Sequence, residues 1–276
     1  MGRQTRRRRH PLSGYIGELF GADGAPGCLL LHGFTGSAAD WAGWPQDMPS
    51  ALAIDLPGHG RSPPPSGGFG SEITRLLAAL PLSIGCLIGY SLGGRIALSL
   101  LAAAPARFRV AIILSAHPGL ADTAQRNARR AADRHWIELL RGRGIAAFTA
   151  AWEQQPLFAT QRRLPAARLV GQHARRLAQD AEGLARALEV FGLAEMPATW
   201  DAVVRWRGRL DWIVGSQDRK FLGIAEQVLA QRADGRLHSL PGIGHNPLIE
   251  APEQLFALLR HLLAETPEAH GDRINR

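Results

Sequence analysis

Short apolar runs alternate with amphipathic stretches in two separate parts of this 276-residue chain. Apolar runs of about four to eight residues between glycines and prolines predict buried strands, and longer amphipathic stretches predict helices. The predicted strands cover 15–20, 28–31, 51–56, 82–88, 110–115, 210–214 and 235–240. The predicted helices cover 71–80, 92–100, 221–231 and 252–265. This alternation predicts an α/β fold with a mostly parallel sheet flanked by helices.

The pattern changes between residues 117 and 200. No segment there is patterned like a strand, whereas 123–140, 145–154 and 168–192 have helical spacing, the last with breaks. A helical block between two parts of one sheet predicts an inserted cap over the carboxyl edge of the strands, where open α/β sheets bind ligands. The predicted division is a core of 15–116 and 201–265, a helical cap of 117–200, a disordered basic tail of 1–14 and a C-terminal tail of 266–276.

The stretch GYSLG at 89–93 places Ser91 between a predicted strand and a predicted helix. Glycines two positions before and after Ser91 leave room where the strand and the helix approach each other closely. The free amides at the helix N-terminus favour negative charge beside the serine. This pattern is typical of a nucleophile elbow, although an ordinary strand-to-helix turn is the alternative.

A serine acts as a base or nucleophile only if a second group takes its proton and a third orients that group. Asp218 follows the predicted strand 210–214 in a glycine turn, and His245 follows the strand 235–240 in another. The order serine, aspartate, histidine, with both partners after late strands, is that of α/β hydrolases. We therefore predict a triad of Ser91, Asp218 and His245.

Other acidic and histidine residues are weaker candidates for the triad. Asp211 lies inside a predicted strand, so we expect it to point away from the site or to pair with Arg209. His238 and His261 are expected to be packing or surface residues, because one lies within a strand and the other on the last helix. Asp201 precedes its strand and falls at the wrong edge.

Two loops after early strands carry further polar residues. The run 28–31 leads into HGFTG at 32–36, where a second backbone donor could face the elbow serine; the alternative is a plain turn in which His32 caps the backbone. Asp55 and His59 follow the next strand, and we expect them to form a hydrogen-bonded pair that holds the loop.

Composition and charge narrow the classes of function. The hydrophobic content of 46% is enough for a full core without a metal or disulfide. The net charge is +8, and five arginines within the first nine residues leave +3 for the rest (8 minus 5). Because there is no RNA-recognition signature and no zinc spacing, we expect no nucleic-acid partner. No apolar stretch forms a signal peptide or a membrane span, so we expect the cytoplasm, where Cys28 and Cys86 would be buried thiols.

Motifs beyond the triad resemble one family. They are GYSLGGR (89–95), HPGL (117–120), QRNAR (125–129), WEQQPLF (152–158) and DRKF (218–221). Together they resemble the 2-succinyl-6-hydroxy-2,4-cyclohexadiene-1-carboxylate synthase (MenH) family of the α/β-hydrolase superfamily. The similarity covers about residues 27–265 and includes the cap, which varies most between families of this fold; esterases share the elbow but not usually these cap segments.

The resemblance implies a lyase of menaquinone biosynthesis. Its members eliminate pyruvate from 2-succinyl-5-enolpyruvyl-6-hydroxy-3-cyclohexene-1-carboxylate and leave 2-succinyl-6-hydroxy-2,4-cyclohexadiene-1-carboxylate, with no metal or organic cofactor. Ser91, deprotonated by His245, would abstract the ring proton, and Asp218 would hold the imidazole. The amides of Phe34 and Leu92 would stabilise the developing oxyanion.

The resemblance also implies a set of substrate contacts. A substrate with several carboxylates suits arginines, whose planar guanidinium groups bind carboxylates in pairs of hydrogen bonds. Arg176 is the expected second arginine of the cap, and His173 is the alternative in another alignment. Related enzymes often have tyrosine where this chain has Glu153, which leaves one contact open. The residues carried over are Tyr90, Arg95, Gln125, Arg129, Trp152, Phe158, Arg176 and Lys220.

Several of these residues have structural roles as alternatives to substrate contact. Tyr90, Trp152 and Phe158 could wall the substrate ring or simply pack the core, and Lys220 could be a surface charge. The alternative function is a serine hydrolase, either an esterase or a carbon–carbon bond hydrolase, that uses the same triad. A noncatalytic binding protein ranks last, because no triad member is missing. The expected partner is a small polycarboxylate, and the expected state is a monomer or weak homo-oligomer.

Overall fold

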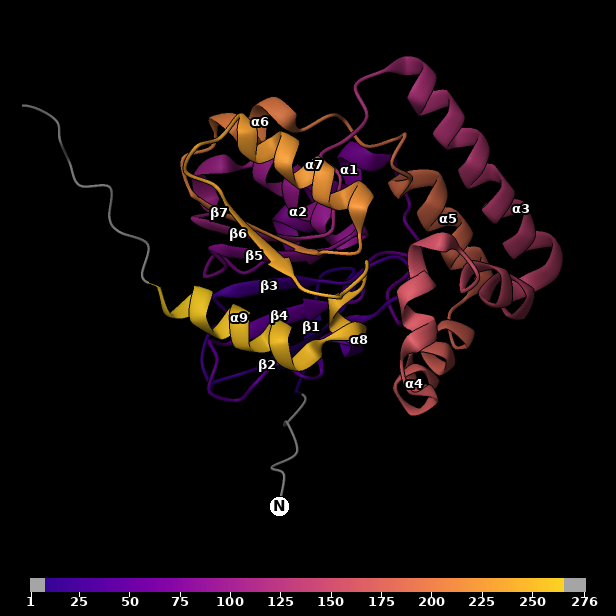
Figure 1. Cartoon of the computed structure of the whole chain (residues 1–276), viewed down its shortest axis with the longest axis horizontal. Coiled ribbons are helices and arrows are strands. Elements are labelled where there is room, and N and C mark those ends of the chain that lie inside the picture. The colour runs from indigo at the N-terminus through magenta and orange to yellow at the C-terminus, as the bar shows by residue number, and fades with distance from the viewer. Residues whose placement is uncertain (1–7, 266–276) are drawn as a thin grey trace, which may run out of the picture.

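A computed structural model describes residues 8–265, so most of the basic tail and the whole C-terminal tail predicted above lie outside the described residues. Within that range the strands form one eight-stranded sheet of order β1-β2-β4-β3-β5-β6-β7-β8 (Figure 1). Neighbouring strands pair in parallel along the stretch β4-β3-β5-β6-β7-β8 of this order. Strand β2 pairs antiparallel with both β1 and β4. The strands are β1 (Arg8–Leu12), β2 (Tyr15–Phe20), β3 (Cys28–Leu31), β4 (Ala51–Ile54), β5 (Cys86–Tyr90), β6 (Val110–Leu114), β7 (Arg209–Gly215) and β8 (Arg236–Leu240).

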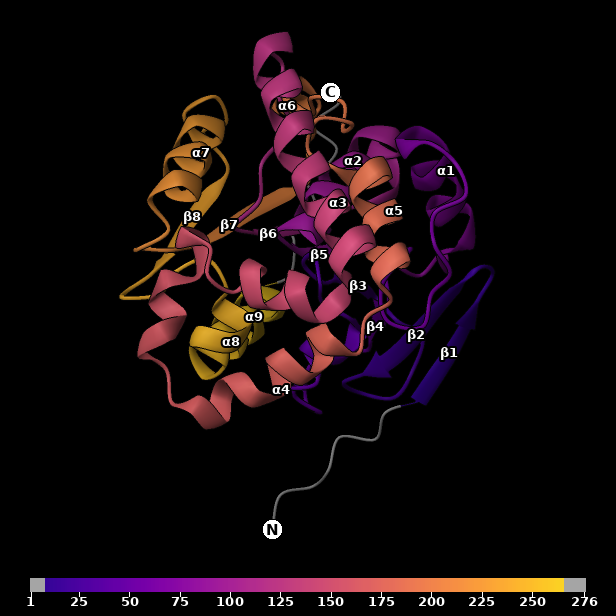
Figure 2. The same ribbon diagram turned by 90° about the vertical axis from the view of Figure 1, so that its right-hand side faces the viewer.

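Helices cover both faces of the sheet, as Figure 2 shows. Alternate residues of a strand point to opposite faces, and β6 divides accordingly: Ala111 and Ile113 pack with one group of helices, and Ile112 packs with the other. The first group contains α1 (Phe69–Ala79), α2 (Leu92–Ala103), α6 (Trp200–Arg205) and α7 (Arg219–Ala230). The second contains the short helix η1 (Ala38–Trp41), α8 (Pro247–Glu250) and α9 (Pro252–Ala264). The predicted fold class, a mostly parallel sheet flanked by helices, is confirmed.

The helices that follow β6 up to residue 191 form a separate layer, here called the cap (123–191), whereas α6 packs on the sheet. They are α3 (Thr123–Trp152), the short helix η3 (Pro156–Arg163), α4 (Ala166–Leu177) and α5 (Ala181–Phe191). Figure 1 shows α3, α4 and α5 together at one side of the sheet. Gln179 donates to the carbonyls of Thr35 and Gly36, which follow β3, and accepts from the amide of Gly60, which follows β4. The cap therefore lies over the carboxyl edge of these strands.

Two sequence-based boundaries need correction. Residues 8–12 are strand β1 and not disordered tail, because a turn at Gly14, whose φ of 81° suits glycine, folds them back onto β2. Strand β5 begins at Cys86 and not at residue 82, because Leu82 is 90% exposed in a turn. The predicted break between the helices at 123–140 and 145–154 is confirmed, because α3 is interrupted at Gly144 by a φ of 73°.

None of the helices in the described part of the chain is long and apolar enough to cross a membrane.

Candidate active site

The elbow at Ser91 is a strained turn between β5 and α2. Ser91 has φ 51° and ψ −107°, a backbone conformation that residues with a side chain rarely adopt. A Cβ on Gly93 would lie 2.2 Å from the carbonyl oxygen of Leu31, and one on Gly89 would lie 2.4 Å from the carbonyl oxygen of Gly93. Glycine is therefore required on both sides for the turn to form, and the turn raises the serine at the end of the strand.

Ser91, His245 and Asp218 form a continuous hydrogen-bonded chain. The Oγ of Ser91 lies 3.1 Å from Nε2 of His245, and Nδ1 of His245 lies 2.7 Å from Oδ2 of Asp218. Because a carboxylate can only accept, Nδ1 carries the proton and Nε2 is free to accept the proton of the serine. The imidazole is 2% exposed and packs against the ring of Phe221, with 4.5 Å between centroids. The arrangement can make Ser91 a base or a nucleophile.

Two free amides border the serine. Leu92 is the first residue of α2, where the amide has no helical acceptor, and Phe34 lies in the loop after β3. Within the described residues, no carbonyl or side chain accepts a hydrogen bond from either amide. Amides of this kind, preorganised near a nucleophile, can stabilise an oxyanion.

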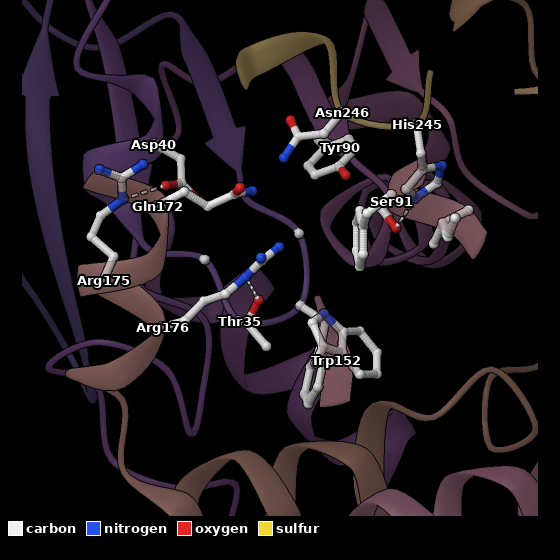
Figure 3. A pocket seen from close by; sticks show the side chains of 15 residues that line it. Thr35, Asp40, Tyr90, Ser91, Trp152, Gln172, Arg175, Arg176, His245 and Asn246 are labelled. Atoms are coloured by element: carbon white, nitrogen blue, oxygen red, sulfur yellow. Dashed lines mark hydrogen bonds and ion pairs between the residues drawn. The ribbon is translucent and has the colours of Figure 1, made fainter. Parts of the chain in front are cut away.

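A pocket opens on Ser91 and His245 (Figure 3). Of the residues singled out from the sequence, Phe34, Tyr90, Ser91, Trp152, Phe158, Arg176 and His245 line it. The pocket also contains residues that the sequence analysis did not identify: Asp40, Leu157, Gln172, Arg175 and Asn246. Two of them had a signal in the sequence: Asn246 follows the triad histidine directly, and Leu157 lies within the motif 152–158.

Arg176 projects from α4 into this pocket, and His173 does not line it. The Arg176 side chain is nearly fully buried, and its Nε donates to Oγ1 of Thr35 at 3.2 Å. Its guanidinium also lies 5.1 Å from the ring centre of Phe158. Of the two residues considered for the second cap carboxylate, Arg176 is thus the one at the pocket.

Four residues expected to contact substrate lie outside this pocket. Arg95 is half-buried and donates to the carbonyl of Phe191 at 2.6 Å. Arg129 pairs with Asp133 one turn along α3. The Lys220 ammonium lies over the ring of Phe221. The backbone amide of Gln125 donates to the side chain of Asp122, which caps the N-terminus of α3.

Three of these residues nevertheless lie near one another. Burial, followed by the charges of Lys220, Arg95 and Arg129, lowers the pKa of His117 to about 4. Burial, followed by Arg129, also lowers the pKa of Arg95 to about 9. We call Arg95, Arg129 and Lys220 the basic cluster. Arg95 lies in the helix that follows the elbow, Arg129 lies in the cap, and Lys220 lies two residues after the triad aspartate.

The loops after β3 and β4 are held differently from the expectation. Asp55 does not bind His59; it accepts from the amide of Ala38 at 2.7 Å and from Arg61, because the loop places His59 toward the backbone of Pro57. His32 accepts from the amide of Leu56 through Nε2, which is the capping role considered above. Burial lowers the pKa of His32, and burial followed by His32 lowers that of His59 to about 3, so both are neutral at pH 7.

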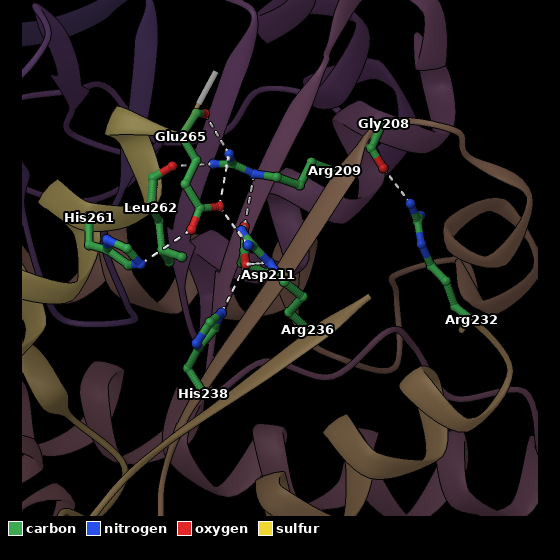
Figure 4. Close-up of polar contacts among 9 residues, drawn as sticks. All are labelled: Gly208, Arg209, Asp211, Arg232, Arg236, His238, His261, Leu262 and Glu265. Atoms are coloured by element: carbon green, nitrogen blue, oxygen red, sulfur yellow. Dashed lines mark hydrogen bonds and ion pairs between the residues drawn. The ribbon is translucent and has the colours of Figure 1, made fainter. Parts of the chain in front are cut away.

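The rival acid Asp211 belongs to a network at the opposite end of β7 (Figure 4). Its carboxylate is fully buried and accepts two hydrogen bonds from Arg236 and one from His238, and Nε of Arg209 lies 3.1 Å away. Arg209 in turn donates to the carbonyl of Glu265 at the end of α9. The expected pairing of Asp211 with Arg209, away from the triad, is confirmed.

We expect Asp211→Asn to lower the free energy of unfolding by about 3 kcal/mol at pH 7, because it leaves two arginines without their carboxylate. Burial raises the pKa of Asp211, but hydrogen bonds from His238 and Arg236 lower it more, so the net shift is downward. A lowered pKa contributes stability above the ordinary value of 3.8 that is lost as the pH falls through the lowered value. The difference in free energy of unfolding between wild type and variant should therefore become smaller below pH 3.8, as measured by urea unfolding across a pH series. A gap of the same size at pH 7 and pH 3 would contradict this.

Within the described residues, no group of three or more histidine, cysteine, aspartate or glutamate side chains is arranged to hold a metal ion.

Comparison with known proteins places the chain among catalysts of this fold. The Alpha/beta hydrolase family matches residues 28–258. The chain is 34% identical over 249 residues to 2-succinyl-6-hydroxy-2,4-cyclohexadiene-1-carboxylate synthase of Enterobacter sp. (strain 638), which covers 88% of this chain and 93% of that protein. It is 31% identical over 252 residues to the putative enzyme of the same name from Bacillus subtilis (strain 168), with 88% and 92% covered.

Solved structures agree with these relatives. MenH from S. aureus superimposes with a TM-score of 0.83 and 26% identity, covering 90% of this chain and 97% of that one. A thermophilic esterase from Thermogutta terrifontis superimposes with a TM-score of 0.77 at 21% identity, covering 94% and 98%, and this likeness concerns the fold alone.

Proposed function

Because this chain belongs to the alpha/beta hydrolase family and, within it, to the 2-succinyl-6-hydroxy-2,4-cyclohexadiene-1-carboxylate synthase (MenH) family, we propose that it is a carbon–oxygen lyase. It eliminates pyruvate from 2-succinyl-5-enolpyruvyl-6-hydroxy-3-cyclohexene-1-carboxylate in menaquinone biosynthesis. The observation that carries the proposal is the hydrogen-bonded chain of Asp218, His245 and Ser91 opening on a pocket that also holds a buried arginine, Arg176.

The reaction begins with proton transfer. His245 takes the proton of Ser91 through Nε2, 3.1 Å from Oγ, and Asp218 stabilises the imidazolium through Nδ1. The serine oxygen then removes the ring proton next to the succinyl carbonyl, which is the most acidic one because its carbanion delocalises onto that carbonyl oxygen. The electron pair moves through the ring double bond and expels the enolpyruvyl oxygen, so a second ring double bond forms and the enolate of pyruvate leaves. The proton held by His245 then converts the enolate to pyruvate, and the serine, which keeps the ring proton, and the neutral imidazole are restored.

The enolate oxygen that develops in this step needs donors. The amides of Phe34 and Leu92 are unpaired within the described residues and supply them, each worth about 3 kcal/mol in comparable sites. Tyr90, Trp152 and Phe158 line the same pocket and would hold the ring out of water.

The carboxylates of the substrate need fixed positive charge. Arg176 would bind one carboxylate in the pocket, and the basic cluster of Arg95, Arg129 and Lys220 would attract another. Gln125, which matches a family contact position, lies in the first turn of the same cap helix as Arg129.

The test of the function is a lactate dehydrogenase coupled assay for pyruvate with the enolpyruvyl substrate. Rapid pyruvate release supports the lyase. The second candidate is a serine hydrolase, an esterase or carbon–carbon bond hydrolase, because the same triad would serve acyl transfer. Absence of pyruvate release together with rapid hydrolysis of nitrophenyl esters would replace the first proposal by the second.

We expect Arg176→Ala to raise KM for the substrate roughly 10-fold to 100-fold with a smaller effect on kcat, because it removes a charge-assisted hydrogen bond to a carboxylate. The matched control is Arg168→Ala, on the same helix but paired with Glu253 at the surface, and its KM should equal that of wild type. An unchanged KM for Arg176→Ala would remove this arginine from the substrate site.

The remaining parts of the proposal concern the setting of the enzyme. A small polycarboxylate as ligand, no nucleic-acid partner, no cofactor, and a monomer or weak homo-oligomer in the cytoplasm are retained as expectations. Cys28 and Cys86 support the compartment, because they are buried, unbridged thiols on paired strands.

A further inference from the structure

Arg176 is held by protein groups on two of its nitrogens. Its Nε donates to Oγ1 of Thr35, and its Nη1 donates to Oε1 of Glu153 at 3.0 Å. Within the described residues, Nη2 has no hydrogen-bond acceptor, and only 5% of the side chain is exposed. Figure 3 shows the guanidinium pointing into the pocket beside Thr35. A ligand carboxylate therefore has one open side of the guanidinium to bind, and Glu153 already occupies another.

Glu153 is itself shared between two residues of α4. It lies at the C-terminal end of α3, outside the lining of the pocket, and its Oε2 is 3.0 Å from Nδ1 of His173. His173 and Arg176 are three residues apart, so they lie on the same side of α4. One carboxylate from α3 thus joins the exposed His173 to the buried Arg176.

The charges of this group determine how strongly it attracts an anion. Arg176 contributes one positive charge and Glu153 one negative charge, so with a neutral His173 the three side chains have no net charge. A ligand carboxylate at Arg176 then sits near a second carboxylate that repels it, while the hydrogen bond from Arg176 remains. Arg176 therefore attracts an anion less strongly than an unpaired arginine would. Its two partners, Thr35 and Glu153, fix the orientation of its guanidinium.

We propose that Glu153 is a positioning residue that orients Arg176 and weakens its hold on the ligand carboxylate, with His173 holding Glu153 in place. The inference rests on the proposed function, in which the ligand is a polycarboxylate. Substrate and product both carry the carboxylates that pyruvate elimination leaves untouched. A fully charged, buried arginine would bind both equally, which lowers KM without favouring the transition state. Glu153 reduces this shared binding and so helps the product to leave.

The test separates the charge of Glu153 from its hydrogen bond. Glu153→Gln keeps an oxygen acceptor for Arg176 but removes the negative charge, and we expect KM to fall roughly threefold to tenfold, with kcat unchanged or lower. Glu153→Ala removes both, so the gain in KM should be partly lost. The matched control is Glu182→Gln, which removes a cap carboxylate that pairs with Arg141 at the surface and should leave KM unchanged.

A double-mutant cycle with Arg176 makes the inference falsifiable. Because Arg176 is the group that holds the ligand carboxylate beside Glu153, Glu153→Gln should have no effect on KM when Arg176 is already alanine. An equal fall in KM in both backgrounds, or a KM for Glu153→Gln at or above that of wild type, would overturn the proposal. Loss of structure would move kcat and the unfolding midpoint as well, and a fall in KM alone cannot come from it.

Calorimetric titration with succinate distinguishes this inference from the proposed function. Succinate is a dicarboxylate of the same kind as the substrate arm, and its binding needs no turnover. We expect succinate to bind the Glu153→Gln variant more tightly than wild type. The Arg176→Ala variant and the double variant Arg176→Ala with Glu153→Gln should bind succinate with equal affinity. Failure of wild type to release pyruvate would refute the proposed function, whereas equal succinate affinity in wild type and Glu153→Gln would refute the role of Glu153.

Discussion

Ser91→Ala is expected to reduce pyruvate release at least ~10³-fold while the fold stays intact. The Oγ of Ser91 is the group that meets His245, 3.1 Å away, and it has no other hydrogen-bond partner within the described residues. Alanine keeps the Cβ, so the cost of the backbone conformation at φ 51° is the same in both proteins. The coupled pyruvate assay measures the loss, and thermal unfolding checks the fold.

A matched control accompanies this variant. Ser71 lies on the surface of α1 and bonds only to the carbonyl of Gly68, so Ser71→Ala should keep full activity. If Ser91→Ala kept its activity while His245→Ala lost it, the histidine would be the base that removes the ring proton, and the role given to Ser91 would be wrong. Full activity in both would remove the whole triad from the reaction.

Gly93→Ala is expected to cost more than ~3 kcal/mol of stability and to abolish activity. The new Cβ would meet the carbonyl oxygen of Leu31 at 2.2 Å and that of His32 at 2.6 Å. Both are backbone atoms at the end of β3, so relief requires the strand end to move. The loop that starts there carries the Phe34 amide, and moving it displaces one of the two oxyanion donors.

Urea unfolding measures the stability lost in Gly93→Ala, and Gly70→Ala is the matched control. Gly70 lies in α1, is exposed, and a Cβ there has no neighbour within 4 Å. That substitution should stabilise the protein by about 0.5–1 kcal/mol, because alanine favours a helix over glycine. A Gly93→Ala variant with the unfolding midpoint of wild type would show that the elbow tolerates a side chain and that the close approach of β3 and α2 is not required.

The local pattern of the sequence was sufficient for the sheet and the elbow. Buried strands such as β6 are continuous apolar runs, and their type follows from the run alone. The edge strand β1 was missed because its sequence, RRHPL, is basic and polar, and its strand conformation comes from pairing with β2. Pairing partners are tertiary information, since an edge strand needs no apolar face of its own.

The residues around the pocket illustrate the same limit. His173 and Arg176 are one turn apart on a helix, so periodicity places both on one side of α4 and cannot tell which one reaches the pocket. Gln172 and Asp40 line the pocket although they belong to no recognisable motif, because segments more than a hundred residues apart meet there. Asp55 and His59 are close in sequence but bind other groups, because each has a nearer backbone partner.

The sequence by itself determined the order of strands and helices, the glycine-flanked serine and the acid and histidine that follow late strands. These are local properties, because they depend on the size and polarity of neighbouring residues. Only the tertiary structure decided that Arg176 reaches the pocket, that Glu153 pairs with it, and that Arg236 joins Asp211. Charged side chains are long and flexible, so their partners are set by distances in the folded chain that no spacing in the sequence records.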